Sequence, residues 1–199
     1  MLLAGGASRR FGGFPKGLAL VKEIRIADRA LIALTGATDA QLVVSNDPDA
    51  AQWFPALTVV GDAEPGLGPL AGIATGLRAA AGAAVVVLAW DMPFVTAPLL
   101  RGMRALGELD GAAVIPVHSA GQIAEPLCAY YPPHALETCL RLLEAGERRA
   151  GALVEALPLT VSIPERLLVE HGDLERLFMS VDSPEQLAAI GGEMPATRR

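Results

Sequence analysis

The first twenty residues, MLLAGGASRRFGGFPKGLAL (residues 1–20), decide how the rest of the chain is organised. Leu2 to Ala4 form a short apolar run that predicts a buried strand, and a loop with two Gly-Gly pairs follows. Glycine has no Cβ, so such a loop can adopt positive φ and approach a ligand closely. Its successive N–H groups form a concavity that attracts anions. Arg9, Arg10 and Lys16 add positive charge there, so the loop suits a polyphosphate.

This loop differs from two common phosphate-binding motifs. A P-loop needs Ser or Thr after its lysine, whereas Gly17 follows Lys16. The Rossmann fingerprint G-x-G-x-x-G is also absent, because GLGPLAGI (residues 66–73) has one residue too many between its last two glycines. We interpret Gly68-Pro69 as a close-packed helix start. The alternative for the N-terminal loop is a flexible, solvated turn, but apolar runs on both sides favour a loop held at both ends.

Length and composition are typical of one globular domain. The 199 residues are 52% hydrophobic and 19% charged, which argues against a disordered chain. We find no repeat or linker, and we expect one domain over residues 1–190 and a mobile tail at 191–199. The net charge of −6 argues against binding to nucleic acid or an anionic membrane. The chain has no membrane-length apolar run and no secretory signal, so we expect a cytoplasmic protein.

The cysteines and histidines form no recognisable metal pattern. Cys128 and Cys139 lack C-x-x-C spacing, and His118, His134 and His171 are scattered along the chain. We therefore expect reduced, buried thiols and no zinc site.

Strand-like and helix-like segments alternate along the whole chain. The expected strands, after the first, are residues 41–45, 57–61, 84–90, 112–116, 127–131 and 159–163, the last as an edge or hairpin strand. The expected helices are residues 26–34, 68–81, 98–106, 132–144, 149–156 and 183–190. The run at 84–90 is nearly continuous in Val and Leu, which indicates a strand buried on both faces. This alternation predicts an α/β fold with helices on both faces of a mostly parallel sheet.

Polar residues follow four of the expected strands, at the loop after Ala4, at Ser45-Asn46, at Asp62 and at Asp91. Ligands of open parallel sheets bind beyond the carboxyl ends of the strands, so we expect these groups to surround one crevice. Asp91 follows the expected strand at residues 84–90, and Met92-Pro93 prevents that strand from continuing. We therefore expect an exposed Asp91 carboxylate that suits Mg²⁺. Magnesium usually takes one or two protein carboxylates, with phosphates and waters as its other ligands. The alternative interpretation is that Asp62 and Asp91 are ordinary turn residues.

Together these segments resemble the molybdenum cofactor guanylyltransferases, the MobA-type nucleotidyltransferases. The resemblance starts with L-A-G-G-x-S-x-R-x-G-G-x-x-K-G-L (residues 3–18). Further matching blocks follow in order: GPLAGI (68–73), WDMPFV (90–95), EPL (125–127), AGERR (145–149) and VDSPEQL (181–187). The resemblance spans nearly the whole chain. It implies a single-domain, Rossmann-like, three-layer α/β/α nucleotidyltransferase fold of the nucleotide-diphospho-sugar transferase (GT-A) type.

The resemblance also implies a reaction, in which a terminal phosphate of molybdopterin attacks the α-phosphate of GTP and pyrophosphate leaves. Such transfer needs mainly positioning and charge neutralisation, and no nucleophilic Ser or Cys is required. By resemblance, Arg10 and the Gly5-Gly6 loop hold the β- and γ-phosphates. Lys16 neutralises charge on the α-phosphate, and Mg²⁺ bound to Asp91 bridges phosphate oxygens. The implied protein partners are transient ones, from cofactor biosynthesis or molybdoenzyme maturation.

The resemblance assigns residues to two substrates. Those expected at the nucleotide are Leu3, Ala4, Gly5, Gly6, Lys16, Ser45, Asn46, Asp62, Gly68 and Asp91. Those expected at the acceptor are Glu125, Arg148 and Asp182.

Several alternatives stay open. LAGG favours guanine, because related cytidylyltransferases more often have LAAG, but Ser45 and Asn46 remain equal candidates for reading the base. Asp182 is either a second metal ligand, an acceptor contact or the cap of the following helix, where Ser183 competes. Transfer from CTP or to another phosphate acceptor, and a non-catalytic nucleotide-binding module, are the rival functions. Pro15 replaces the family's usual Asp, and the first strand is shorter than in the family, as an incomplete N-terminus would produce.

Overall fold

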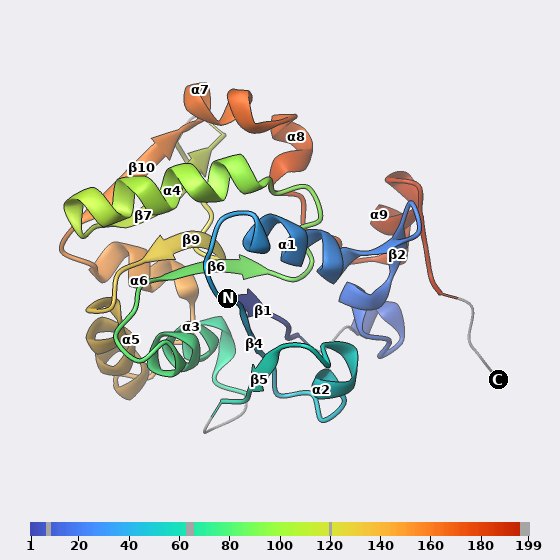
Figure 1. Cartoon of the computed structure of the whole chain (residues 1–199), viewed down its shortest axis with the longest axis horizontal. Helices are drawn as coiled ribbons and strands as arrows, with labels where there is room; N and C mark the ends of the chain where they lie inside the picture. Colours follow the sequence, from blue (N-terminus) through green and yellow to red (C-terminus); the bar gives the residue numbers. More distant parts are fainter. Residues whose placement is uncertain (7–8, 63–65, 120, 196–199) are drawn as a thin grey trace.

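A mostly parallel central sheet organises the fold (Figure 1). The structure is a computed structural model that describes residues 1–6, 9–62, 66–119 and 121–195. Within these residues the sheet has the strand order β10-β7-β9-β6-β1-β4-β5, and β8 pairs with β7 at one side. The strands are β1 (Leu2–Leu3), β4 (Leu42–Val44), β5 (Thr58–Val60), β6 (Val85–Ala89), β7 (Ala113–His118), β8 (Ile123–Ala124), β9 (Cys128–Tyr131) and β10 (Thr160–Pro164).

β1 lies between β4 and β6 and runs parallel to both, so Leu2 has Val43 on one side and Leu88 on the other. The pairs β4–β5 and β7–β10 are also parallel, whereas β9 runs antiparallel between β6 and β7. The chain therefore moves outward from β1 to β5 and then returns to β6 on the other side of β1. This reversal creates the crevice at which open α/β sheets bind ligands.

Helices cover both faces of the sheet. α1 (Ile26–Thr35) and α4 (Ala97–Asp110) pack together on one face, and α3 (Gly68–Ala79), α5 (Ala135–Glu144) and α6 (Ala150–Ala156) form a layer on the other. β6 is buried along its whole length. The predicted three-layer α/β/α fold and the mostly parallel sheet are thus confirmed, and the predicted edge strand is β10.

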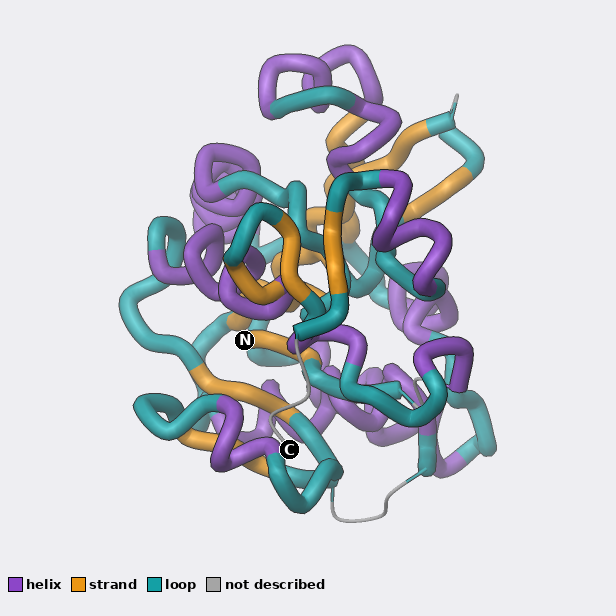
Figure 2. The backbone as a smooth tube through the Cα atoms, turned by 90° about the vertical axis from the view of Figure 1, so that its right-hand side faces the viewer, coloured by secondary structure: helices purple, strands orange, loops and turns teal. Residues whose placement is uncertain are grey.

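A second, smaller sheet lies beside the main one, next to α9 (Pro184–Ala189) (Figure 1). Its strands β2 (Leu20–Val21), β3 (Ile24–Arg25) and β11 (Gly192–Glu193) lie in the order β11-β2-β3, and Figure 2 views them from that side. They share a small apolar cluster with the N- and C-terminal segments, made of Phe11, Ala19, Val21, Ile26, Val181 and Leu187. The sequence pattern did not predict this sheet, because strands of two residues show no periodicity.

The end of the folded region differs from the prediction. The sequence placed a mobile tail at residues 191–199, but Gly192 pairs with Val21 and Glu193 with Leu20. The backbone hydrogen bonds of β2 hold these two residues, so the ordered chain extends beyond residue 190. Residues 196–199 lie outside the described residues.

Short helices complete the described chain. They are α2 (Ala50–Trp53), α7 (Glu165–Leu168), α8 (Leu174–Leu177), α9 (Pro184–Ala189) and the 3₁₀ turns η1 (Arg9–Phe11), η2 (Lys16–Leu18) and η3 (Val169–His171). The Ser183 hydroxyl caps α9 by accepting the Gln186 N–H at 3.3 Å. Ser183, rather than Asp182, is therefore the cap. Among the described residues, no helix is both long and apolar enough to cross a membrane.

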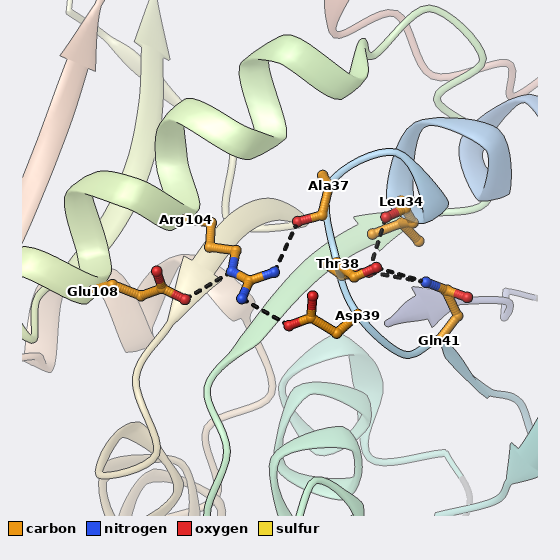
Figure 3. A network of polar contacts seen from close by, with 7 residues as sticks. All are labelled: Leu34, Ala37, Thr38, Asp39, Gln41, Arg104 and Glu108. Atoms are coloured by element: carbon orange, nitrogen blue, oxygen red, sulfur yellow. Dashed lines mark hydrogen bonds and ion pairs between the residues drawn. The ribbon is translucent and has the colours of Figure 1, made fainter.

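One arginine ties α4 to the connection between α1 and β4 (Figure 3). The Arg104 guanidinium donates to Glu108 and to Asp39, both at 2.7 Å, and to the Ala37 carbonyl at 3.3 Å. The Arg104 hydrogen bond holds the pKa of Asp39 below its usual value. This connection leads into β4. The network therefore lies at the amino end of that strand, away from the carboxyl ends of the sheet.

Two leucines of α4 provide a test of the core. Leu99 is fully buried and Leu109 is 80% exposed. We expect Leu99→Ala to lower the free energy of unfolding by about 2–5 kcal/mol, because it leaves a cavity in the core. Leu109→Ala, the matched control, should change it by less than about 0.5 kcal/mol. Urea unfolding followed by circular dichroism measures both, and equal losses would contradict this packing of α4.

Candidate functional site

A cleft of about 440 Å³ opens at the carboxyl ends of β1, β4, β5 and β6. Ser45-Asn46, Asp62 and Asp91 all line it, together with the glycines that follow β1. The predicted convergence of these groups on one crevice is confirmed. The lining residues are Leu3, Gly5, Gly6, Val44, Ser45, Asn46, Asp62, Gly66, Gly68, Pro69, Gly72, Ala89, Trp90, Asp91 and Leu127.

On one wall, two hydrogen bonds join Asn46, which follows β4, to Asp62, which follows β5. The Asn46 Oδ1 accepts the Asp62 backbone N–H at 2.7 Å, and its Nδ2 donates to Asp62 Oδ2 at 2.8 Å. The other Asp62 oxygen accepts from the Thr75 hydroxyl of α3 at 2.6 Å. Ser45 is buried, and its Oγ accepts the Asp47 N–H at 3.3 Å. Asn46 is therefore the more exposed of the two candidate base readers.

On the opposite wall, Asp91 is buried, with only 8% of its surface exposed. The expectation of an exposed carboxylate was wrong, because the segment before α9 covers it. The Ser180 hydroxyl donates to Asp91 Oδ2 at 2.9 Å, and the Val181 N–H donates to the Asp91 carbonyl at 3.0 Å. The Oδ1 atom is buried and accepts no hydrogen bond from the described residues. A buried carboxylate oxygen without a donor is an available ligand position.

Lys16 lies directly between two carboxylates. Its ammonium group forms an ion pair with Asp91 Oδ2 and a second with Asp182 Oδ1, the latter at 2.5 Å. Burial lowers the pKa of Lys16, but the charge of Asp91 and the hydrogen bonds to both carboxylates outweigh burial and raise it. Lys16 is thus a fixed positive charge beside Asp91, which lines the cleft. The N-terminal loop and Asp91 meet here, as the sequence predicted.

Arg10 and Asp182 belong to the same cluster. Burial raises the pKa of Asp182, but the hydrogen bond and charge of Lys16, with the charge of Arg10, bring it below its usual value. The exposed Arg10 therefore contributes its charge at this wall. Neither Asp182 nor Lys16 lines the cleft, and Lys16 connects Asp182 to Asp91, which does.

The glycine loop borders the cleft and a second hollow beside it. Gly5 and Gly6 line both, Leu3 lines the first and Ala4 the second. Gly6, Gly12 and Gly13 have φ values of 109°, 64° and 87°, where a side chain would be strained. Residues 7 and 8, inside the resemblance block, lie outside the described residues.

The start of α3 packs tightly, as Gly68-Pro69 predicted. Gly68 has φ of 79°, and a Cβ there would lie 3.0 Å from the Arg148 carbonyl. The Leu70 N–H donates to that same carbonyl at 3.3 Å. Gly68 thus allows α3 to begin against the segment before α6, at the rim of the cleft.

The other two expected acceptor residues lie apart from this cleft. Glu125 follows β8 and pairs with His118 of β7, with 2.7 Å between Oε1 and Nε2, and the His118 ring stacks on Phe178. Burial raises the pKa of Glu125, although its hydrogen bond to His118 opposes this. The Arg148 side chain turns to the Leu143 and Glu147 carbonyls and borders a groove between α3 and α5. Neither lines the cleft.

Several contacts at the site had no signal in the sequence. Thr75 and Ser180 orient Asp62 and Asp91, but each is distant in sequence from the carboxylate that it contacts. Trp90, next to Asp91, stacks on Trp53 of α2. Trp90 belongs to the WDMPFV block, but its pairing with Trp53 depends on the tertiary fold.

The comparisons with known proteins agree with this geometry. The family sequence model named MobA-like NTP transferase domain matches residues 1–161 of this chain. The chain belongs to the MobA-like NTP transferase family. The resemblance inferred from the sequence is therefore confirmed, and this family member is a nucleotidyltransferase.

Relatives in the family cover nearly the full chain. A probable molybdenum cofactor guanylyltransferase of Chloroflexus aggregans is 34% identical, over 99% of this chain and 95% of its own. The molybdenum cofactor guanylyltransferase of Pseudomonas putida is 34% identical, over 94% of each chain. The structure of molybdopterin-guanine dinucleotide biosynthesis protein A from Archaeoglobus fulgidus superposes with a TM-score of 0.79 at 27% identity, over 95% of this chain and 94% of its own.

The ion pair of Asp182 with Lys16 predicts a pH effect. Because the folded state lowers the Asp182 pKa, its ionised form stabilises the fold above the unfolded value of 3.8. That contribution is lost as the pH falls through the folded pKa. We expect Asp182→Asn to lower the free energy of unfolding at neutral pH, and the difference from wild type to shrink below pH 3.8.

Urea unfolding at a series of pH values measures this difference. Asp110→Asn, at the exposed end of α4, is the matched control and should show little difference at any pH. A difference for Asp182→Asn that stays constant down to the acid limit would contradict the expectation.

Proposed function

We propose that this chain transfers GMP from GTP to a terminal phosphate of molybdopterin and releases pyrophosphate. The phosphate oxygen attacks the α-phosphorus of GTP, and the bond from that phosphorus to the α–β bridging oxygen breaks. One observation carries the proposal: Lys16 of the glycine-rich loop contacts Asp91 at a cleft where polar strand ends converge. Family membership and the names of the relatives support the nucleotide and the acceptor.

The nucleoside occupies the wall formed by β1, β4, β5 and α3 in this proposal. Leu3 and Gly68 border it, and the paired Asn46 and Asp62 present an amide and a carboxylate with fixed orientation. Since each holds the other and Thr75 holds Asp62, these groups need little reorganisation when the base or ribose binds. Asn46 is the better candidate for contact with the base, because the Ser45 hydroxyl is buried and accepts the Asp47 N–H.

The triphosphate lies over the loop after β1. Gly5 and Gly6 supply backbone N–H groups, and Arg10 and Lys16 supply charge for the β-, γ- and α-phosphates. Lys16 must exchange part of its contact with Asp91 for the α-phosphate. Asp182 keeps the ammonium at the same place during this exchange, because it holds Lys16 from the other side.

Asp91 fits a divalent metal. Its Oδ1 is buried and accepts no hydrogen bond from the described residues, which also hold no group of three or more acidic, His or Cys side chains that could bind a metal ion. A site with one carboxylate is typical of Mg²⁺, whose other ligands are substrate phosphates and waters. When bound there, Mg²⁺ neutralises negative charge on phosphate oxygens. We assign Mg²⁺ to Asp91.

The acceptor side is assigned to the residues beyond Asp91. Asp182 contacts Lys16 there, and Glu125, whose side chain pairs with His118, precedes by two residues Leu127, which lines the cleft. Arg148 is the weakest of the three candidates, because its guanidinium already donates hydrogen bonds to the Leu143 carbonyl of α5 and to the Glu147 carbonyl. Contact with proteins of cofactor biosynthesis or molybdoenzyme maturation, and a cytoplasmic location, stay predictions.

A nucleotide panel tests the proposal. The protein is mixed with molybdopterin, Mg²⁺ and each nucleoside triphosphate, and pyrophosphate release is followed. Release with GTP supports guanylyl transfer. Release with CTP instead would make the chain a cytidylyltransferase, and binding without release would make it a non-catalytic module.

Asp91→Asn tests the metal assignment. We expect metal-dependent pyrophosphate release to fall by about 100-fold or more, because a neutral amide binds a divalent cation poorly. The circular dichroism spectrum should stay unchanged. Asp110→Asn, the same change at the exposed end of α4, should retain full turnover. Unchanged turnover in Asp91→Asn would remove Asp91 from the mechanism.

Thr75→Val tests the orientation of Asp62. It removes the hydroxyl that donates to Asp62 Oδ1 at 2.6 Å and keeps the shape of the side chain. A hydrogen bond to a charged group contributes about 1.5–3 kcal/mol, so we expect KM for GTP to rise about tenfold or more with a smaller change in kcat. Thr58→Val on β5, where the side chain is exposed, is the control and should leave KM unchanged. Equal KM values in wild type and Thr75→Val would contradict the assigned role.

A further inference from the structure

The Trp90 indole ring lies where three segments of the site meet. Trp90 precedes Asp91, and only 3% of its surface is exposed. Its backbone N–H donates to the Leu3 carbonyl at 3.0 Å, next to the glycine loop. Its ring stacks on Trp53, with 6.0 Å between centroids and 20° between planes. The third segment is η2, which carries Lys16.

Gly17 packs directly on the Trp90 ring. A Cβ at Gly17 would lie 2.2, 2.5 and 2.8 Å from the Cε3, Cδ2 and Cζ3 ring atoms. Gly17 has no left-handed φ, so its backbone conformation would accept alanine. The lack of space is therefore the reason for glycine at this position.

The ring has little freedom to move away. Trp53 belongs to α2, and its carbonyl accepts from the Arg25 guanidinium at 3.0 Å. Arg25 is in turn held by Asp28 of α1, at 2.6 and 2.7 Å. A side chain at Gly17 would thus displace η2 rather than the ring.

The two contacting residues are each next to a charged residue of the site. Gly17 follows Lys16, and Trp90 precedes Asp91, so the separation of the glycine from the ring fixes how closely the ammonium approaches the carboxylate. We propose that Trp90 is a positioning residue, whose ring acts through its contact with Gly17 to set Lys16 against Asp91. The inference rests on the proposed function, because it concerns the Lys16 and Asp91 of that reaction.

A double-mutant cycle tests the contact. We expect Gly17→Ala to lower kcat for pyrophosphate release by about tenfold or more, with KM for GTP nearly unchanged, because an ångström-scale displacement is costly in a catalytic site. Trp90→Leu removes the ring and makes room for the new methyl group. In that background Gly17→Ala should cost less than about threefold, since only residues in contact couple strongly. Trp90→Phe keeps a ring, so Gly17→Ala should remain costly to kcat in that background.

The controls separate positioning from stability. Gly102→Ala, on α4, is the matched change, since a Cβ there meets nothing within 4 Å, and it should retain full kcat. Thermal unfolding is measured for every variant. If Gly17→Ala lowers kcat equally in both backgrounds, the inference is overturned. It is also overturned if Trp90→Leu restores the melting temperature of Gly17→Ala without restoring kcat.

Crystal structures of the variants test the same positioning role without an activity measurement. We expect the Lys16 ammonium and the Asp91 carboxylate to separate beyond the about 4 Å limit of an ion pair in Gly17→Ala, and to return within it in Gly17→Ala/Trp90→Leu. An intact pair in the single variant overturns the inference. A wild-type protein that releases no pyrophosphate from any nucleoside triphosphate would instead overturn the proposed function and leave this structural readout valid.

Discussion

The ion pair between Lys16 and Asp91 is the interaction on which the site depends. A buried carboxylate is costly unless a charge or hydrogen bonds compensate it. Asp91 meets this requirement with residues from distant parts of the chain, the ammonium of Lys16 and the hydroxyl of Ser180. The pair therefore connects the N-terminal loop, the end of β6 and the segment before α9. A nucleotide that draws Lys16 towards its phosphates would act on all three segments, and the remaining bond to Asp182 limits how far the ammonium can move.

Most of the main sheet and its helices followed from local patterns. The continuous Val and Leu run of β6 predicts burial on both faces, and the 3.6-residue spacing in α1 and α3 predicts helices that cover the sheet. The patterns failed for β2, β3 and β11, each of two residues. A strand that short has no period to detect, and the pairing of β11 with β2 joins residues at opposite ends of the sequence. For the same reason, the predicted domain end at residue 190 left out the paired Gly192 and Glu193.

The position of the site was predictable, but its detailed contacts were not. Polar residues that follow parallel strands must meet at one sheet edge, which correctly placed Asn46, Asp62 and Asp91 together. The burial of Asp91 was missed, because a strand pattern does not show that Ser180 and Val181 cover the carboxylate. Likewise, the sequence shows Gly17 as one more glycine in a glycine-rich loop. Only the fold shows that the Trp90 ring fills the space where a side chain would lie.

The pairing of β11 with β2 has a consequence for how the protein is made. The N-terminal loop leaves the ribosome before the segment that completes its cluster, yet its lysine contacts Asp182 and its neighbouring hairpin pairs with Gly192 and Glu193. The nascent chain can build the strands from β1 to β10 before these residues are synthesised, but it cannot assemble the complete cluster around Lys16. The cluster around Lys16 is therefore complete only after residues 182–193 are synthesised, and a chain that stops before them would contain nearly the whole main sheet without this cluster.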